Sequence, residues 1–332
     1  EFVEKYIKQE EKAKERILSK ENESYHEGGW LYTINVWFNI VGASGMTDSV
    51  LNDQIAKLNE DFRKQNSDVS TRWGDLPADT WIEFAWDPNH KAEVSGYYNG
   101  IPVSSFAVFD SSDSNSDYYD PVSPWGGCDC EPIKSTAHGG LDPTSPATYL
   151  NVWIGSIHNP QGNILGYAQF PGYTPDTDGI VMHMDALIGG SFTNYNLGRT
   201  LVHEVGHYLN LRHIWGDSDC NFDDLVADTP VAGAPNYGSG GNCPSLTADS
   251  CPMHPYVDMW ENYMDYTYDG CVNMFTKDQR TRMLDTLNNT RTGIRTKTAC
   301  PTCSDPAATT TTTSEPTTTT TAEPTTTTTA GP

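Results

Sequence analysis

A three-histidine segment constrains this chain more than any other stretch. Residues 203–213 read HEVGHYLNLRH. On a helix, His203 and His207 project from one face, where their imidazoles can bind the same metal ion. His213 follows His207 by about 600° of helical rotation, so a continuing helix would turn it away from that face. The segment therefore predicts a helix that ends after His207 and a chain that turns back.

Asn210 lies where that turn is needed. After glycine, asparagine most readily adopts the left-handed conformation found at helix ends. The outcome would be a three-histidine tetrahedral zinc site with one open position, and Glu204 beside it as a candidate general base. An HExxH pair alone is a weak pattern, because two such histidines can simply be packed or solvated. The third histidine and a further signature downstream favour the metal site.

That further signature is NYMDY at residues 262–266. Zincins with a third histidine place a methionine-containing turn under the metal. Met264 would pack its thioether beneath the histidines without ligating them, and Tyr266 would turn its phenol toward the metal or a developing oxyanion. Taken alone, Met264 would be an ordinary core methionine; the histidines upstream favour the turn.

Composition indicates a folded, exported protein. The 332 residues are 36% hydrophobic, which suffices for a substantial core. The net charge of −24 argues against nucleic acid or an anionic membrane as a partner. No coiled-coil heptad or long apolar segment indicates membrane insertion or an obligate oligomer, so we expect a monomer.

The cysteines predict disulfides, as expected outside the cytosol. Four of them flank loops around the histidines without ligand-type spacing: Cys220, Cys243, Cys251 and Cys271. The residues alone permit any of three pairings. The other four form two local pairs, Cys128 with Cys130 and Cys300 with Cys303 in sequence. Their connectivity is open; a link between the two pairs would fasten the end of the domain to its body.

Composition also divides the chain into three regions. Residues 1–28 are rich in charged residues, with a few apolar residues at helical spacing. They are either the remnant of a prosegment or an amphipathic helix. Residues 304–332 are rich in Thr and Pro, which predicts an extended, O-glycosylated linker or tail to a module that the sequence does not identify. Residues 29–303 would form the catalytic domain.

Hydrophobic periodicity outlines the elements of that domain. Strand patterns occur at 31–41, 80–86, 149–157 and 164–170. A helix is predicted from about Thr47 to Lys64, with Asp48 following Thr47 as part of a start signal. This alternation ahead of the histidine helix predicts a twisted mixed sheet backed by helices.

An acidic loop follows the histidines. Its five carboxylates belong to Asp217, Asp219, Asp223, Asp224 and Asp228. Carboxylates this close repel one another unless they are solvated or bridged by a hard cation such as calcium, which favours several oxygen ligands. A calcium site and a solvated acidic loop both fit the residues.

Several ordered blocks resemble one known family. They include TINVWFNIV (33–41), TWIEFAWDP (80–88), YLNVWIG (149–155), LGYAQFPG (165–172), GRTLVHEVGHYLNLRHIWGD (198–217), DDLVADTP (223–230) and NYMDYTYDGCVNMFT (262–276). Over roughly residues 30–290 the chain resembles the pappalysin family of metzincin zinc endopeptidases. It departs from the wider metzincin pattern at Asn210, where that pattern has Gly, and residues 110–140 fit less well.

The resemblance implies an α+β fold, a metzincin-type zincin with a twisted mixed five-stranded sheet, an active-site helix and a Met-turn subdomain. It implies disulfides between Cys220 and Cys251 and between Cys243 and Cys271. It also implies that an edge strand above the zinc binds extended substrate by antiparallel pairing; the residues concerned are Gly166, Tyr167 and Ala168. The residues alone also allow an ordinary protected edge strand.

The resemblance further implies a secreted zinc endopeptidase that hydrolyses peptide bonds in proteins. Zinc would be held by His203, His207 and His213, with Glu204 as general base and Tyr266 stabilising the tetrahedral intermediate. Calcium would be a structural cofactor, with Asp224 and Asp228 the preferred side chains.

Two other classes remain as alternatives. A non-catalytic zinc-containing binding protein would usually have lost the base, whereas Glu204 is present. A zinc hydrolase that cleaves bonds other than peptide bonds has less need of a peptide-binding edge strand. The sequence leaves open the side-chain specificity, the natural substrate and the role of residues 1–28.

Overall fold

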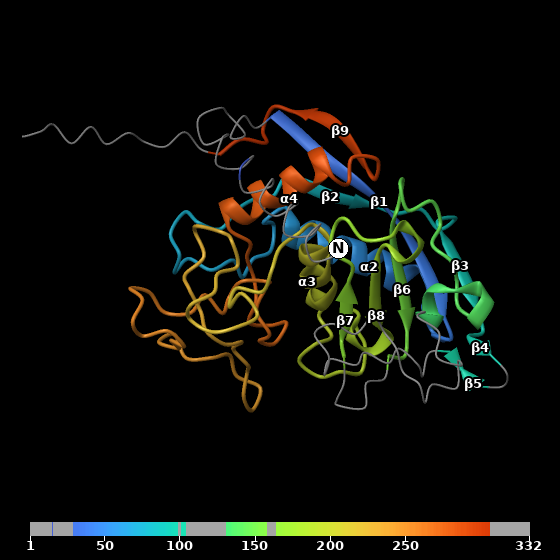
Figure 1. Cartoon of the computed structure of the whole chain (residues 1–332), viewed down its shortest axis with the longest axis horizontal. Coiled ribbons are helices and arrows are strands. Elements are labelled where there is room, and N and C mark those ends of the chain that lie inside the picture. The colour runs from blue at the N-terminus through green and yellow to red at the C-terminus, as the bar shows by residue number, and fades with distance from the viewer. Residues whose placement is uncertain (1–14, 16–28, 99–100, 104–130, 158–163, 306–332) are drawn as a thin grey trace, which may run out of the picture.

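The computed structural model describes residues 29–98, 101–103, 131–157 and 164–305, together with Glu15 (Figure 1). The rest of the predicted N-terminal segment, the Thr/Pro-rich region beyond Asp305, and both Cys128 and Cys130 lie outside the described residues. None of the described helices is both long and apolar enough to cross a lipid bilayer.

A 13-residue strand, β1 (Gly29–Val41), organises the sheet. Strand order along the main path is β2 (Ile82–Ala85), β1, β6 (Leu150–Gly155), β8 (Ile180–His183) and β7 (Gly166–Ala168). Neighbours are parallel except β7, which pairs antiparallel with β8. This mixed five-strand path agrees with the predicted architecture. Because β7 ends the path, its second edge carries no partner strand among the described residues.

The sheet also holds two strands beyond the predicted five. On the β2 side of β1, β3 (Lys91–Val94) follows in parallel, and β9 (Arg295–Cys300) pairs antiparallel with the first half of β1. Each edge of β1 thus holds two partners in succession. Neither β3 nor β9 was predicted from the sequence. The four residues of β3, KAEV, give only two apolar positions, and β9, RTKTAC, has polar residues at its first four positions. A small separate hairpin joins β4 (Tyr97–Tyr98) to β5 (Ile101–Pro102).

Two helices, α2 (Asp48–Phe62) and α3 (Arg199–Tyr208), pack with the sheet in the main core. The first starts at Thr47, whose hydroxyl accepts a hydrogen bond from the Val50 amide. Its bounds agree with the predicted helix to within two residues. The buried stripe recurs at helical spacing: Leu51, Ile55, Leu58 and Phe62. A smaller core contains Val41, Val103, Ile133, Trp153, Ile157 and Val181.

Four short 3-10 helices lie in the described connections: η2 (Pro132–Lys134) and η3 (Thr136–His138) between β5 and β6, η4 (Pro175–Thr177) between β7 and β8, and η5 (Met184–Ala186) between β8 and α3. Long loops join α3 to α4 (Lys277–Asn289), and they form the yellow and orange part of Figure 1, to the left of the sheet. Helix α4 begins with a capping box, in which Thr276 and Gln279 exchange hydrogen bonds between side chain and backbone.

Two disulfides cross-link these loops. They join Cys220 to Cys251 and Cys243 to Cys271, the pairing that the resemblance implies. Each closes a loop of 31 or 28 residues. Such a cross-link stabilises a fold by about 3 kcal/mol, mainly by restricting the unfolded chain.

The third disulfide settles part of a connectivity that the sequence left open. Cys300 is joined to Cys303 rather than to the Cys128 and Cys130 pair. The chain turns directly after β9, and the Cys303 amide donates to the Cys300 carbonyl at 2.9 Å. This turn brings the two sulfurs together. The end of the domain is fastened instead by the pairing of β9 with β1, where Gly29 lies opposite Cys300.

Candidate active site

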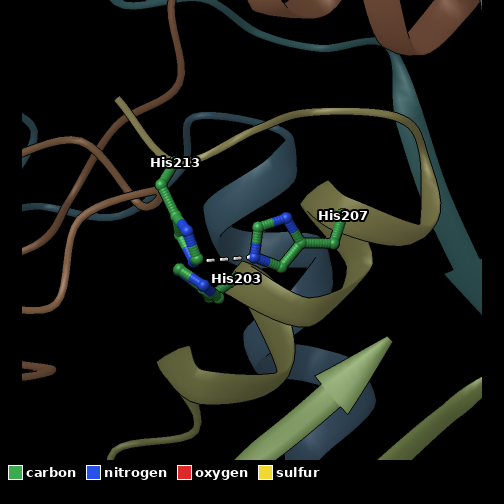
Figure 2. Close-up of side chains that lie close together, drawn as sticks. All are labelled: His203, His207 and His213. Carbon is green, nitrogen blue, oxygen red and sulfur yellow. Dashed lines mark hydrogen bonds between the residues drawn. The ribbon is translucent and has the colours of Figure 1, made fainter. Parts of the chain in front are cut away.

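The three predicted histidines gather at one point. His203 and His207 project from α3, and His213 approaches from the chain that follows (Figure 2). One ring nitrogen from each lies within 4.8 Å of the others. Within the part of the chain that the structure describes, this is the single cluster of at least three His, Cys, Asp or Glu residues able to hold a metal ion.

Asn210 ends the helix in the predicted manner. Its φ of 77° is left-handed. The Leu211 amide donates to the Gly206 carbonyl and the Asn210 amide to the His207 carbonyl, both at 2.8 Å. These two bonds form a Schellman motif, which satisfies the last carbonyls of the helix and reverses the chain. The reversal places His213 opposite α3.

Each histidine has a second partner at its Nδ1 atom. His203 Nδ1 donates to the Tyr263 carbonyl at 2.7 Å, and His207 Nδ1 donates to the Leu211 carbonyl at 2.8 Å. His213 Nδ1 lies against the carboxylate of Asp217. A carbonyl only accepts, so the proton resides on Nδ1 and the Nε2 lone pair is left for a metal.

The Nε2 atoms then face one another without a proton between them. His207 Nε2 and His213 Nε2 are 3.0 Å apart. Two lone pairs at this distance repel unless a cation lies between them. Burial, followed by the neighbouring His213, lowers the pKa of His203 to about 3 and that of His207 well below its usual value. Neutral imidazoles in this arrangement are the donor set of a zinc site.

Glu204 points into a cleft beside the histidines. The cleft has a volume of about 630 Å³ and is lined by His203, Glu204, Gly166 and Tyr266 among others. The Glu204 side chain is buried, and burial raises its pKa to about 8. No described amide or side chain donates a hydrogen bond to it. The side chain is therefore available to hydrogen-bond a water or a substrate.

Met264 packs beneath α3. It is fully buried, and a Cβ atom placed on Gly206 would lie only 2.4 Å from the Met264 sulfur. Gly206 thus allows the methionine to approach the helix closely. The turn is held by Asn262, whose side-chain oxygen accepts from the Met264 amide at 2.9 Å. The preceding Tyr263 carbonyl orients His203.

Tyr266 stands at the mouth of the cleft. Its ring centroid lies 4.7 Å from that of His213 and 5.7 Å from that of His203, and its side chain is 39% exposed. Burial by its neighbours, followed by the charge of Glu204, raises the pKa of its phenol above the usual value. The group is therefore a protonated hydrogen-bond donor near neutral pH.

Two residues around the third histidine were not predicted in this role. The indole of Trp215 stacks on the His213 ring at 4.3 Å and 4° between planes. Asp217 was predicted only as one of the acidic-loop residues. Both follow His213 within four residues, but spacing alone gives no sign of ring stacking in a turn.

The edge strand β7 lies directly against α3, the helix that carries His203 and Glu204. A Cβ atom on Gly166 would meet Glu204 Cγ at 3.0 Å, so a glycine permits this approach. Tyr167 and Ala168 complete the strand and pair with Val181 and Ile180 of β8. All three β7 residues are partly exposed. Phe170, just beyond, places its ring 5.2 Å from that of His207.

The two predicted calcium residues have other contacts. Asp224 is 1% exposed and accepts hydrogen bonds from the Val226 amide and the Thr229 hydroxyl. Asp228 accepts from the Thr276 hydroxyl and the Asp278 amide, at the start of α4. Burial raises the pKa of Asp228 to about 6 and that of Asp224 well above its usual value.

Comparison with known proteins places this site in a family. The peptidase M43 profile, described as pregnancy-associated plasma protein-A, matches residues 142–288. An extracellular metalloprotease of Arthroderma gypseum is 31% identical over 262 residues, which cover 76% of this chain and 71% of that protein. The chain belongs to the pappalysin family.

Other relatives of this pappalysin match over a shorter span. An extracellular metalloprotease of Colletotrichum graminicola is 42% identical over 136 residues, 39% of this chain and 47% of that protein. The match thus spans about half the length of that relative. Among solved structures, mature mirolysin of Tannerella forsythia in complex with a cleaved peptide has a TM-score of 0.63 at 32% identity, covering 80% of this pappalysin and 95% of that chain. The fold is the α+β metzincin fold.

Proposed function

We propose that this pappalysin is a secreted zinc-dependent endopeptidase that hydrolyses peptide bonds in proteins. The observation that carries the proposal is the convergence of three imidazoles beside a cleft into which Glu204 points. The mirolysin structure contains a cleaved peptide, and relatives are named extracellular metalloproteases.

His203, His207 and His213 would hold the zinc ion through Nε2. When bound, zinc lowers the pKa of a water to about 7 and polarises a carbonyl. The residues around it supply the remaining chemistry. A zinc ion held by the histidines would favour the ionised form of Glu204 over the protonated form that burial favours. No described residue donates a hydrogen bond to this carboxylate, so it can accept a proton from a water in the cleft and return it to the leaving nitrogen.

Tyr266 would donate its phenolic hydrogen to the oxyanion that develops on the scissile carbonyl. Its position beside His203 and His213 at the cleft supports this role, and its raised pKa keeps the hydrogen in place. One preorganised donor of this kind contributes about 100- to 1000-fold in rate.

The outer edge of β7 would bind an extended substrate. Its main-chain groups at Gly166, Tyr167 and Ala168 can pair with a peptide irrespective of its sequence. The closeness of Gly166 to Glu204 supports this assignment, because a peptide paired to β7 would pass the general base.

The remaining features fit an extracellular enzyme. We assign residues 29–303 to the catalytic domain, residues 1–28 to an N-terminal segment and residues 304–332 to a linker or tail, and we expect a monomer that binds neither nucleic acid nor membranes. The disulfides among the described residues support an oxidising compartment.

Structural calcium would be held near Asp224 and Asp228. The buried carboxyl group of Asp224 has no basic partner among the described residues, which supports a cation at this position.

Hydrolysis of a denatured protein tests the function. The purified chain is incubated with the substrate, with and without a zinc chelator, and the cleavage sites are read by mass spectrometry. We expect internal cleavages that the chelator abolishes and added zinc restores. Chelator-resistant cleavage, or no cleavage by protein that carries one zinc per chain, would refute the proposal.

A further inference from the structure

Arg291 lies between the active-site helix and the edge strand, although it follows α4 far along the chain. The residue is 8% exposed. Its Nε atom donates to the Tyr208 carbonyl at 2.8 Å, and Nη2 donates to the Gln169 carbonyl at 3.0 Å. Tyr208 is the last residue of α3, and Gln169 follows the last residue of β7. One guanidinium therefore joins the ends of two elements of the proposed site.

Asp178 fixes the orientation of that guanidinium. Both of its carboxylate oxygens accept from Arg291, one from Nη1 and the other from Nη2 at 2.9 Å. The guanidinium also lies over the Tyr208 ring, with Cζ 3.5 Å from the ring centroid. A forked pair and a covered ring face restrain the planar group in two directions, which a lysine ammonium would not reproduce.

The Gln169 carbonyl lies at the end of β7, next to a residue that contacts the histidine cluster. Gln169 is hydrogen-bonded to Gly179 through its amide, which continues the pairing of β7 with β8. Phe170, the next residue, packs on the ring of His207. Arg291 thus restrains the strand where its backbone leaves the sheet, one residue before a contact with a histidine of the cluster.

We propose that Arg291 is a positioning residue that holds the substrate-binding strand β7 at a fixed separation from the catalytic helix α3. The proposal rests on the proposed function, in that β7 is the strand to which substrate pairs. Loss of the guanidinium would free the end of β7, whereas the Nδ1 hydrogen bonds of the three histidines go to groups other than Arg291. The defect therefore falls on substrate binding.

Steady-state kinetics with a fluorogenic peptide substrate test the proposed role of Arg291. We compare wild type with R291A, R291K and D178N, and with R295A as the matched control. Arg295 also donates to a main-chain carbonyl, that of Leu287, but its other contacts are with Asn288 and the Tyr32 ring, away from α3 and β7. For R291A we expect KM to rise about tenfold or more, kcat to stay within about threefold and the zinc dissociation constant within about twofold.

The other variants keep the test informative if R291A folds poorly. R291K should also raise KM, by most of the increase seen in R291A, because the compact ammonium lacks the planar fork that reaches both carbonyls and the carboxylate. D178N should show a smaller increase, and R295A none. Millimolar guanidinium should lower the KM of R291A and leave that of R295A unchanged. An unchanged KM in folded R291K, or equal effects in R291A and R295A, would overturn the proposal.

Hydrogen exchange separates this proposal from the proposed function. Peptides covering residues 164–170 should exchange faster in R291A and R291K than in wild type and R295A, whether or not the wild type cleaves peptides. A wild type without activity but with this change in exchange would refute the proposed function and leave the restraint of β7 intact. Unchanged exchange in both Arg291 variants would refute the restraint itself.

Discussion

The three histidines differ in the groups that orient their rings. Two are oriented by main-chain carbonyls, those of Tyr263 and Leu211, and the third by the carboxylate of Asp217. A side-chain substitution leaves a main-chain carbonyl in place, whereas it removes the Asp217 carboxylate. At the residue scale, the orientation of His213 by Asp217 can therefore be tested with a single substitution, as can the proposed proton transfer by Glu204.

Substitution of Asp217 by Ala should weaken zinc binding about 10- to 100-fold, because His213 loses the group that orients its ring. Chelator competition measures the zinc dissociation constant. D219A is the matched control, since Asp219 lies two residues away and contacts Asn221 instead of a histidine. Equal zinc affinities in D217A and D219A would contradict the assignment.

Glu204→Gln should lower kcat by about 100- to 10,000-fold, because an amide cannot accept the proton from water. The zinc content should stay at one ion per chain, as the three imidazoles are unchanged. Turnover of a peptide and metal analysis on the same preparation check both expectations. Activity like that of the wild type would exclude Glu204 as the base.

At the scale of elements, the active-site helix depends on the turn beneath it. Gly206→Ala would place a methyl group 2.4 Å from the Met264 sulfur. Overpacking of this kind costs about 1–3 kcal/mol, against which the better helix propensity of Ala returns at most about 1 kcal/mol. We expect a lower melting temperature measured by calorimetry. Gly270→Ala is the control, because the nearest atom to its added Cβ, Leu197 Cδ1, is 3.9 Å away.

The sequence predicted elements where one local pattern determined them. The helix at Asp48–Phe62 has an apolar stripe and a capping threonine, and the reversal at Asn210 follows from the required position of His213. Strand β9 was missed because its polar residues take their conformation from pairing with β1, more than 250 residues earlier. The stacking of Trp215 on His213 likewise depends on a turn that no periodicity describes.

Calcium binding would affect the stability of the whole molecule. If calcium is bound near Asp224 and Asp228, mild removal of calcium should lower the melting temperature, because the loop would keep a buried carboxylate without its cation. The measurement is thermal unfolding with a calcium-selective chelator, repeated after calcium is restored. An unchanged melting temperature, with zinc content confirmed, would contradict the calcium site.

The stability of the whole fold should also depend on Asp265. Burial raises the pKa of this carboxyl to about 7, above the value of about 3.9 expected in the unfolded chain. The folded state therefore binds the proton more tightly, and stability decreases as the pH rises from about 4 through 7. D265N should flatten this decrease, by of the order of 1–3 kcal/mol, in denaturant titrations at several pH values. A pH profile identical to that of the wild type would refute the assignment.

The pairing of β9 with β1 also bears on how the polypeptide can be reconnected. The Gly29 amide donates to the Cys303 carbonyl at 2.6 Å, and Gly29 lies opposite Cys300. Paired strands are about 5 Å apart, so a linker of a few residues could join positions 29 and 303. New termini could then be opened in a surface loop, which would give a circular permutant of the domain with the order of its strands in space unchanged.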